Sequence, residues 1–260
     1  MKNFFSLSGK TAFISGANGY LGKSMAEGLA ESGALVYLNG RDGQKIDSLV
    51  KEFEQKNLNV KPAVFDITNQ EDVQEFFSKL DEPFIDVIVN NAYCGVAGSI
   101  ETSSTNDYAS SYDIAMTSTH HLVQCALPYL RNAVKINGDA SVINIASMYG
   151  MVSPDLRIYE SKSVSNPPFY GAAKAALIQW SKYAACEFAS EGIRFNAISP
   201  GPFPSNQAPK SLVSKIENKV PMARIGNPSE LIGPLLFLAS SSSSFVTGIN
   251  LPVDGGWTAW

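Results

Sequence analysis

The 260-residue sequence has little of several residue types, and each shortage narrows the kinds of protein that it can encode. Its three cysteines are widely scattered, which argues against both a disulfide framework and a zinc site. We expect Cys94, Cys125 and Cys186 to be reduced thiols that are buried as small apolar groups. Charged residues make up only 17% of the chain and the formal net charge is -4, so a nucleic-acid-binding surface is not indicated.

Long hydrophobic runs are also missing from the sequence. No apolar stretch approaches the ~18 residues that a membrane-spanning helix needs. The first residues, "MKNFFSLSGK", contain no apolar core of secretory length. We therefore expect a cytoplasmic protein that binds neither membrane nor nucleic acid and whose partner is a small-molecule substrate.

What the sequence does contain is an alternation of two kinds of segment. Short apolar runs rich in β-forming residues are separated by longer stretches in which apolar and charged residues recur at helical spacing. The apolar runs are "KTAFIS", "ALVYLN", "VKPAVF", "FIDVIVN", "ASVINIA", "IRFNAIS" and, last, "GINLPV". Since right-handed crossovers place helices on both faces of a parallel sheet, this pattern predicts a doubly wound α/β fold.

The chain shows no division into smaller units. It has no internal repeat and no linker rich in Pro, Gly or Ser, so residues 1–260 are expected to form one domain, with the serine run at 240–244 as a loop. Two stretches interrupt the strand and helix rhythm. Because long loops in compact domains often bind or cover ligands, we expect a substrate-loop insertion near 151–168 and a lid-like loop near 200–220.

Three glycines follow the first apolar run in the stretch "SGANGYLG". Gly16, Gly19 and Gly22 lie between a predicted strand and a helix that we expect to begin near Tyr20. Glycines at such a junction allow backbone N–H groups and the helix N-terminus to approach a pyrophosphate. The spacing alone also fits an ordinary turn, so its meaning depends on the motifs further along.

Those motifs are "LSGKTAFISGANGYLG", "FDIT", "NNA", "INIAS", "YGAAK" and "NAISPG", in that order. With them, the chain resembles the short-chain dehydrogenase/reductase family from about Leu7 to Gly256. The resemblance implies a Rossmann-type domain with seven parallel strands, a nicotinamide cofactor, and a homotetramer or homodimer. The glycine spacing looks like that of the extended branch of the family, whereas the length and the other motifs resemble the shorter branch.

The resemblance also implies which residues bind the cofactor. Asp66 resembles the residue that binds the adenine amino group, although it could instead be a helix N-cap or an ordinary loop acid. Ser205 stands where relatives use a threonine near the nicotinamide carboxamide. The full implied set is Gly16, Asn18, Gly19, Tyr20, Leu21, Gly22, Arg41, Asp66, Ile67, Asn90, Ala92, Tyr170, Lys174, Pro200, Gly201 and Ser205.

The end of the second apolar run bears on the choice of cofactor. Gly40 stands where NAD-dependent relatives carry a ribose-binding carboxylate, and Arg41 follows it. A guanidinium can pair with a 2′-phosphate, which favours NADP(H) over NAD(H). Two points weigh against this: Arg41 could be a solvated surface charge, and Gly19 occupies a position where many NADP-binding relatives place a second basic residue.

The catalytic residues follow from the chemistry of hydride transfer to a carbonyl, which produces an alkoxide that must receive a proton. Tyr170 and Lys174 are four residues apart and share one helix face, where an ammonium would lower the pKa of a phenol. The resemblance makes Tyr170 the acid/base, Lys174 its partner and a ligand of the nicotinamide ribose, and Ser147 a donor to the substrate oxygen. No metal is expected, and His120 and His121 are interpreted as packing or interface residues.

One departure from the family concerns proton transfer. Ala115 stands where the family usually carries the asparagine of its proton relay. Since an alanine side chain cannot hydrogen-bond a water molecule, three explanations are open. Another group holds the water, or the enzyme is slower, or the protein binds a dinucleotide without catalysis.

The substrate is indicated only by the segment between Ser147 and Tyr170, which at 22 residues is longer than is common in the family. Arg157 or Lys162 in this segment could meet a phosphate, although a solvated insertion without substrate contact is equally open. The segment "SPDLRIYESKSVSNPPFYGAAK" and the ending "VDGGWTAW" look similar to oxidoreductases of bacterial surface-sugar and flagellin-modification pathways.

We therefore predict an NADP-dependent oxidoreductase that acts on a sugar, sugar phosphate or nucleotide sugar. The alternatives are a 3-oxoacyl or polyol reductase/dehydrogenase of the same family, and a non-catalytic dinucleotide-binding protein.

Overall fold

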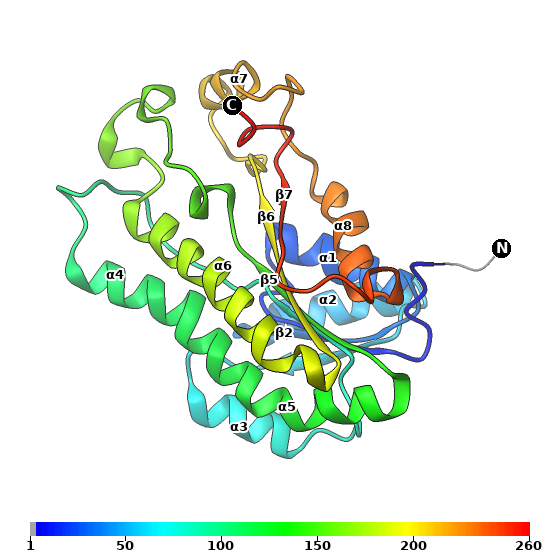
Figure 1. The fold of residues 1–260 in the computed structure, drawn as a ribbon. Coiled ribbons are helices and arrows are strands. Elements are labelled where there is room, and N and C mark those ends of the chain that lie inside the picture. The colour runs from blue at the N-terminus through cyan, green and yellow to red at the C-terminus, as the bar shows by residue number, and fades with distance from the viewer. Residues whose placement is uncertain (1–3) are drawn as a thin grey trace.

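One seven-stranded sheet runs through the computed structural model, which describes residues 4–260 (Figure 1). The strand order is β3-β2-β1-β4-β5-β6-β7, and every neighbouring pair is parallel. The strands are β1 Thr11–Ile14, β2 Leu35–Gly40, β3 Val60–Val64, β4 Val87–Asn90, β5 Ala140–Ile145, β6 Ile193–Pro200 and β7 Asn250–Val253. The predicted doubly wound α/β fold and its seven strands are confirmed.

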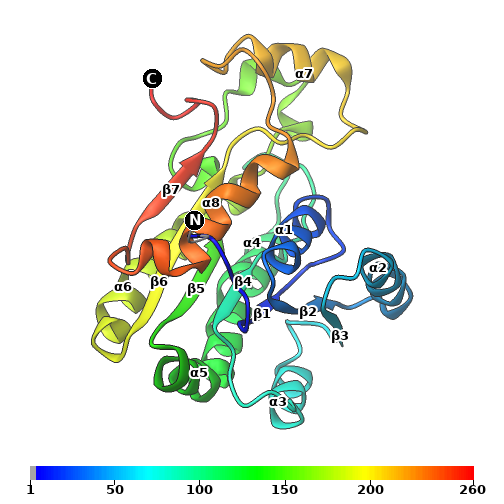
Figure 2. The same cartoon turned by 90° about the vertical axis from the view of Figure 1, so that its right-hand side faces the viewer.

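Helices cover both faces of the sheet (Figures 1 and 2). On one face α1, α2 and α8 bury Leu29, Phe53 and Leu235, and on the other α3, α5 and α6 bury side chains such as Phe77 and Leu122. This two-sided burial is why the central strands are mainly apolar. The helices are α1 Tyr20–Glu31, α2 Gly43–Gln55, α3 Gln70–Ser78, α4 Thr105–Tyr112, α5 Ser118–Asn137, α6 Pro168–Phe188, α7 Lys210–Glu217 and α8 Ile232–Ala239.

Buried charges fix the centre of the sheet. Asp86, which is 2% exposed, accepts hydrogen bonds from Lys10 Nζ (2.9 Å), the Thr11 backbone N–H (2.8 Å) and Asn137 Nδ2 (2.7 Å). These bonds join the start of β1, the start of β4 and the end of α5. Because a carboxylate is costly to bury without partners, this arrangement specifies how the central strands align.

The two predicted long loops lie together beyond the carboxyl ends of the strands (Figure 1). Residues 151–168 contain two short 3-10 turns, Leu156–Ile158 and Lys162–Val164. The 200–220 segment contains a helix, α7, and the serine run contains a 3-10 turn at Ser241–Ser243, where the sequence predicted loops. None of the helices between residues 4 and 260 combines the length and the apolar character needed to cross a bilayer.

The prediction that all three cysteines are buried is wrong. Cys94 and Cys186 are exposed, and Cys125 is partly exposed. Cys94 lies in the loop that follows β4, and Cys186 lies on the outer side of α6. The average burial of a residue type does not decide the burial of a particular residue, because position in the fold does.

Candidate functional site

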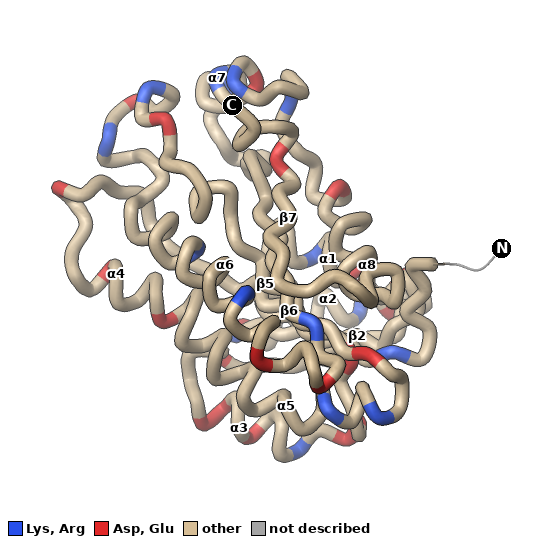
Figure 3. The backbone as a smooth tube through the Cα atoms, viewed as in Figure 1, with Lys and Arg blue, Asp and Glu red and all other residues tan. Residues whose placement is uncertain are grey.

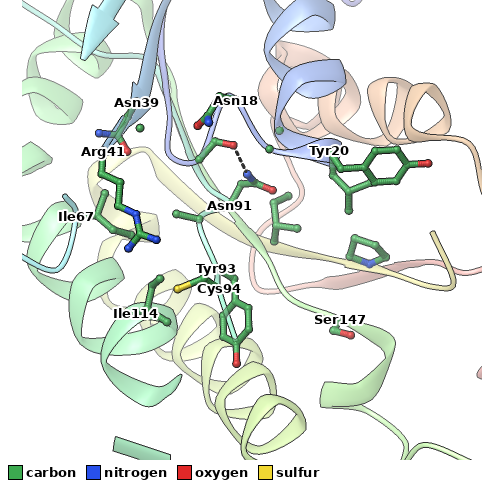
Figure 4. Close-up of a pocket in the computed structure, with 18 of the residues that line it drawn as sticks. Asn18, Tyr20, Asn39, Arg41, Ile67, Asn91, Tyr93, Cys94, Ile114 and Ser147 are labelled. Carbon is green, nitrogen blue, oxygen red and sulfur yellow. Dashed lines mark hydrogen bonds between the residues drawn. The ribbon is translucent and has the colours of Figure 1, made fainter. Parts of the chain in front are cut away.

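A cavity of about 690 Å³ opens at the carboxyl ends of the central strands (Figure 4). It lies where the strand order reverses between β1 and β4, the usual ligand position in an open α/β sheet. Its volume falls within the range of about 300–1,000 Å³ that is typical of sites for small molecules and cofactors.

The glycine stretch after β1 forms one wall of this cavity. Gly16 has a φ of +66°, and a Cβ atom there would lie 2.9 Å from Ala92 Cα. A Cβ atom on Gly22 would lie 2.1 Å from the Gly16 carbonyl oxygen. Helix α1 begins at Tyr20 as predicted, and Gly19, Tyr20 and Leu21 line the cavity. These close approaches require glycine at positions 16 and 22, and they leave the loop and the N-terminus of α1 lining the cavity, an arrangement that we call the glycine cradle.

Asn91 holds this cradle in place. Its Nδ2 donates to the carbonyl oxygens of Ser15 (2.9 Å) and Gly16 (3.1 Å). The Ser15 hydroxyl in turn accepts from the backbone N–H groups of Asn91 (3.0 Å) and Ala92 (3.1 Å). We call this set of four bonds between the ends of β1 and β4 the Ser15–Asn91 latch.

The end of β2 forms the far side of the cavity. A Cβ atom on Gly40 would lie 2.7 Å from Asn18 Oδ1 and 2.8 Å from Ile46 Cδ1, so a side chain at position 40 would collide with both residues. The Arg41 side chain is 69% exposed, and its Nη1 lies 3.9 Å from Asp66 Oδ2. Arg41 lines this end of the cavity, and apart from its long ion pair with Asp66 its side chain is exposed.

Helix α2 begins at the same place. Asp42 is its N-cap and accepts from the Lys45 backbone N–H (3.2 Å), and Lys45 Nζ lies 3.1 Å from Asp42 Oδ2. Both contacts with Lys45 hold the pKa of Asp42 below its usual value. The Asp42 charge is thus engaged by its own helix, and the N-terminus of α2 adds a partial positive charge next to Arg41.

The predicted catalytic residues meet on the opposite wall. Ser147 follows β5, and Tyr170 and Lys174 lie on α6, so all three line the cavity. Burial lowers the pKa of Lys174 to about 8, and its Nζ donates to the Ile145 carbonyl oxygen at 2.7 Å. Burial raises the pKa of Tyr170, while hydrogen bonding from Ser147 opposes that rise. The sequence predicted a lowered pKa for Tyr170, and the direction differs because burial outweighs the nearby donors.

Comparisons with known proteins agree with this geometry. A family model described as enoyl-(acyl carrier protein) reductase matches residues 16–258. Gluconate 5-dehydrogenase of Gluconobacter oxydans is 31% identical over 265 residues, covering 98% of this chain and 97% of the relative. A rhamnolipids biosynthesis 3-oxoacyl-[acyl-carrier-protein] reductase of Pseudomonas aeruginosa is 30% identical over 266 residues, covering 99% of each chain.

The chain belongs to the short-chain dehydrogenase/reductase family. A solved structure of gluconate 5-dehydrogenase from Burkholderia cenocepacia, in complex with NADP and tartrate, superimposes with a TM-score of 0.88 at 26% identity, covering 99% of this chain and 98% of that one. The protein is therefore an NAD(P)-dependent oxidoreductase.

Most of the cofactor residues that the sequence indicated line the cavity of this short-chain dehydrogenase/reductase. They are Gly16, Asn18, Gly19, Tyr20, Leu21, Gly22, Arg41, Asp66, Ile67, Ala92, Tyr170, Lys174, Pro200 and Gly201. Asp66 Oδ1 also accepts from the backbone N–H (2.9 Å) and the hydroxyl (2.8 Å) of Thr68, so it shapes its own loop as well. The N-cap of α3 is Asn69, not Asp66.

Two predicted cofactor residues lie elsewhere. Asn90 is 5% exposed, and its Nδ2 donates to Asn144 Oδ1 at 2.8 Å within the sheet. Ser205 is exposed, and its carbonyl oxygen accepts from the Ala208 backbone N–H at 2.9 Å. Asn91 and Phe203 reach the cavity in their stead.

Further residues that the sequence did not indicate line the cavity, and most of them neighbour predicted ones at the strand ends. They are Asn39, Gly40, Asp42, Lys45, Phe65, Asn91, Tyr93, Cys94, Ile114, Ile145, Ala146 and Phe203. Gly40 was interpreted only as the position where NAD-dependent relatives carry a carboxylate. Ligands of open α/β sheets bind beyond the carboxyl ends of the strands, near the reversal in strand order. The positions that follow the predicted strands therefore include most of these lining residues.

The two histidines of α5 contact neighbouring helices and segments. The His120 ring packs edge-on against Trp180, with 6.1 Å between ring centroids. His121 Nε2 lies 3.3 Å from the Gln70 carbonyl oxygen. No cluster of potential metal ligands is present among residues 4–260.

The 151–168 segment is tied to the rest of the enzyme beside the catalytic wall. Tyr149, two residues after Ser147, places its hydroxyl 3.3 Å from that of Tyr159. Asp155 accepts from Lys219 Nζ at 2.6 Å, which connects the segment to the end of the predicted lid. Asp155 also accepts from Arg157 Nε and Nη2, both at 2.8 Å.

Proposed function

We propose that this protein transfers a hydride between NADP(H) and a carbonyl or alcohol of a sugar, sugar phosphate or nucleotide sugar. The observation that carries the proposal is the charge of the 151–168 segment, which follows Ser147 and contacts Tyr149 through the Tyr159 hydroxyl. The Asp155 carboxylate is shared by two cations, Arg157 and Lys219. One carboxylate between two cations leaves an excess positive charge that suits an anionic substituent of a polar substrate.

The catalytic roles follow from the positions of three side chains. The bound nicotinamide supplies or receives the hydride. The Tyr170 hydroxyl gives a proton to the developing alkoxide in reduction and takes one from the alcohol in oxidation. Ser147 donates a hydrogen bond to the same substrate oxygen. Lys174, when protonated, stabilises the Tyr170 phenolate and binds the nicotinamide ribose.

Preference for NADP is supported by the end of β2. Gly40 brings no carboxylate toward the ribose, and the exposed Arg41 side chain, held only by a 3.9 Å ion pair with Asp66, can pair with a 2′-phosphate. The N-terminus of α2 favours the same group. We expect Arg41→Ala to weaken NADPH binding at least ten-fold more than NADH binding, a difference of about 1.4 kcal/mol.

The matched control for this test is Arg131→Ala. Arg131 lies on α5 and pairs with Glu191 at 2.6 Å, and it does not line the cavity. Its removal should leave both affinities unchanged. Equal losses for the two cofactors in Arg41→Ala would contradict the assignment of the 2′-phosphate site.

A hydroxyl-rich substrate is supported by the surroundings of Ser147. The Tyr149 and Tyr159 hydroxyls lie close to the catalytic wall, and the 151–168 segment and α7 carry residues of both charges (Figure 3). The gluconate 5-dehydrogenases among the relatives support a polyhydroxylated substrate. Substrates of the kind used in surface-sugar and flagellin-modification pathways fit this chemistry.

The first experiment measures NADPH oxidation with keto-sugars, sugar phosphates, nucleotide sugars and a 3-oxoacyl thioester, and NADP reduction with the matching alcohols and polyols. Tyr170→Phe is the control and should abolish turnover. Turnover of the thioester alone, or of simple polyols alone, would replace the sugar proposal with one of those substrates.

The phosphate part of the proposal has a test of its own. Arg157→Gln should raise KM for a phosphorylated substrate while leaving KM for its unphosphorylated analogue unchanged. If KM is unchanged for both the phosphorylated substrate and its analogue, the support for an anionic substituent beside Arg157 is removed.

We also propose that the protein assembles as a homodimer or homotetramer through the face formed by α4 and α6. Tyr108 and Tyr112 are 40% and 50% exposed there, and with Phe169 and Ala172 they line an apolar cavity of about 850 Å³. Sedimentation velocity should give a mass above that of one chain, and Tyr112→Glu should reduce it. A monomeric mass at micromolar concentration would contradict the proposal.

A further inference from the structure

The side chain of Tyr93, which lies after β4, lines the cavity (Figure 4). It packs against the catalytic pair. Its ring meets the Tyr170 ring edge-on, with 4.8 Å between centroids and 68° between planes. Lys174 Nζ lies 5.1 Å from the centroid of the Tyr93 ring and 5.8 Å from that of the Tyr170 ring. One aromatic side chain thus contacts both residues that handle the proton.

The Lys174 ammonium has few other partners. Lys174 is 3% exposed, and its Nζ donates to the Ile145 carbonyl oxygen at 2.7 Å. An ammonium within ~6 Å of an aromatic centroid is stabilised by the ring, and more strongly when it is desolvated. The Tyr93 ring therefore favours the charged form of Lys174, which burial opposes.

The Tyr93 ring is itself fixed by hydrogen bonds. Its hydroxyl lies 2.7 Å from Ser111 Oγ on α4. Ser111 is 3% exposed and donates to the carbonyl oxygen of Phe169 at 3.2 Å. Because Phe169 directly precedes Tyr170, this chain of contacts joins β4, α4 and the start of α6 around the catalytic tyrosine.

Ala115 follows Ser111 on the same helical stretch. It is 3% exposed, and its methyl group can neither donate nor accept a hydrogen bond. We propose that Tyr93 is a positioning residue for the catalytic pair: its ring holds the Lys174 ammonium and the Tyr170 ring in place in a chain that has alanine at position 115. This inference rests on the proposed acid/base role of Tyr170.

Removal of the Tyr93 ring should change the proton affinities of Lys174 and Tyr170. Without it, the charged form of Lys174 is less stable, so Lys174 stabilises the Tyr170 phenolate less. The apparent pKa of Tyr170 should then rise. An exchange of Tyr93 for another aromatic residue should leave it near its original value.

The test compares Tyr93→Leu with Tyr93→Phe in the whole protein saturated with NADP. Phenolate formation is followed by near-ultraviolet absorbance, and the same titration of each variant combined with Tyr170→Phe is subtracted, so no substrate is needed. We expect the Tyr170 pKa to rise by about 1 unit in Tyr93→Leu and by less than about 0.3 unit in Tyr93→Phe. If Tyr93→Leu does not fold, Tyr93→Met is used with the same criterion.

Two outcomes overturn the inference: an unchanged Tyr170 pKa in the variants without the ring, or equal rises in the leucine and phenylalanine variants. Failure of the proposed function is recognised separately, since it would appear as turnover that survives in Tyr170→Phe. The pH profile of kcat for alcohol oxidation provides a second readout. The apparent pKa of its ascending limb should rise in Tyr93→Leu by the same amount as the spectroscopic pKa.

Discussion

The glycine cradle makes a strong prediction, because two opposing effects act on a single substitution. Gly22 is the third residue of α1, and Gly→Ala inside a helix ordinarily stabilises it by about 1 kcal/mol. At this position, however, the new Cβ atom would lie 2.1 Å from the Gly16 carbonyl oxygen and 2.8 Å from Asn91 Nδ2. Cβ atoms essentially never lie within 3.0 Å of a heavy atom beyond their own and the adjacent residues, so the loop must move by about 1 Å.

That movement displaces the backbone that would face the cofactor and disturbs the Asn91 bond to Gly16. Since a misplacement of about 1 Å can cost on the order of a hundred-fold, we expect the Kd for NADPH to rise 30- to 100-fold, or about 2–3 kcal/mol. The measurement is a titration of NADPH fluorescence with purified Gly22→Ala protein.

Gly233→Ala provides the matched control. Gly233 is the second residue of α8, and no atom lies within 4 Å of a Cβ built there. This variant should be slightly more stable than the original protein and should bind NADPH equally well. A less than three-fold change in Kd for Gly22→Ala would show that the loop absorbs the methyl group, and it would refute the steric argument.

Two further predictions concern Lys174 and Cys94. The folded pKa of Lys174, about 8, lies below its ordinary value of 10.5, so the buried ammonium opposes folding at neutral pH and stability should rise as pH increases above about 8. Urea unfolding of the protein without cofactor should therefore gain about 2 kcal/mol between about pH 8 and about pH 9.5, and Lys174→Met should lack this gain. Cys94 is exposed and lines the cavity, whereas Cys186 is exposed on α6. Bound NADPH should therefore slow maleimide labelling of Cys94 but not of Cys186, which mass spectrometry of the labelled peptides can measure. Equal rates at Cys94 with and without NADPH would contradict its place in the site.

The fold could be predicted from the sequence because every strand carries the same local signal. The inner strands β1, β4, β5 and β6 are mainly apolar runs bounded by helical stretches, which is the pattern typical of parallel strands that are buried on both faces. The glycine cradle was also within reach, since Gly16 has a positive φ and Gly22 approaches the Gly16 carbonyl within the same loop, although the contact of Gly16 with Ala92 is distant in sequence. Helix α7 was missed because its apolar residues face a small cluster around Trp257 that only the folded chain brings together.

The sequence could not predict which side chains are partners across the sheet. Nothing local distinguishes Asn90 from Asn91, yet alternate residues of an extended chain point in opposite directions, and Asn90 turns into the sheet while Asn91 turns to the cradle. Tyr93 follows the same motif and was passed over because its significance depends on its distance to Tyr170 and Lys174. The exposure of Cys94 likewise depends on where its loop leaves the sheet.

The Ser15–Asn91 latch has a consequence for the kinetics of cofactor capture. Its four bonds are made within the protein itself, so the glycine loop is already ordered when the nucleotide arrives. Binding then requires no loop ordering on this side of the cleft, and the entropy cost of that step is absent. Preorganisation of this kind predicts single-step association without a slow isomerisation phase, with differences in affinity among variants of the loop arising mainly in the dissociation rate.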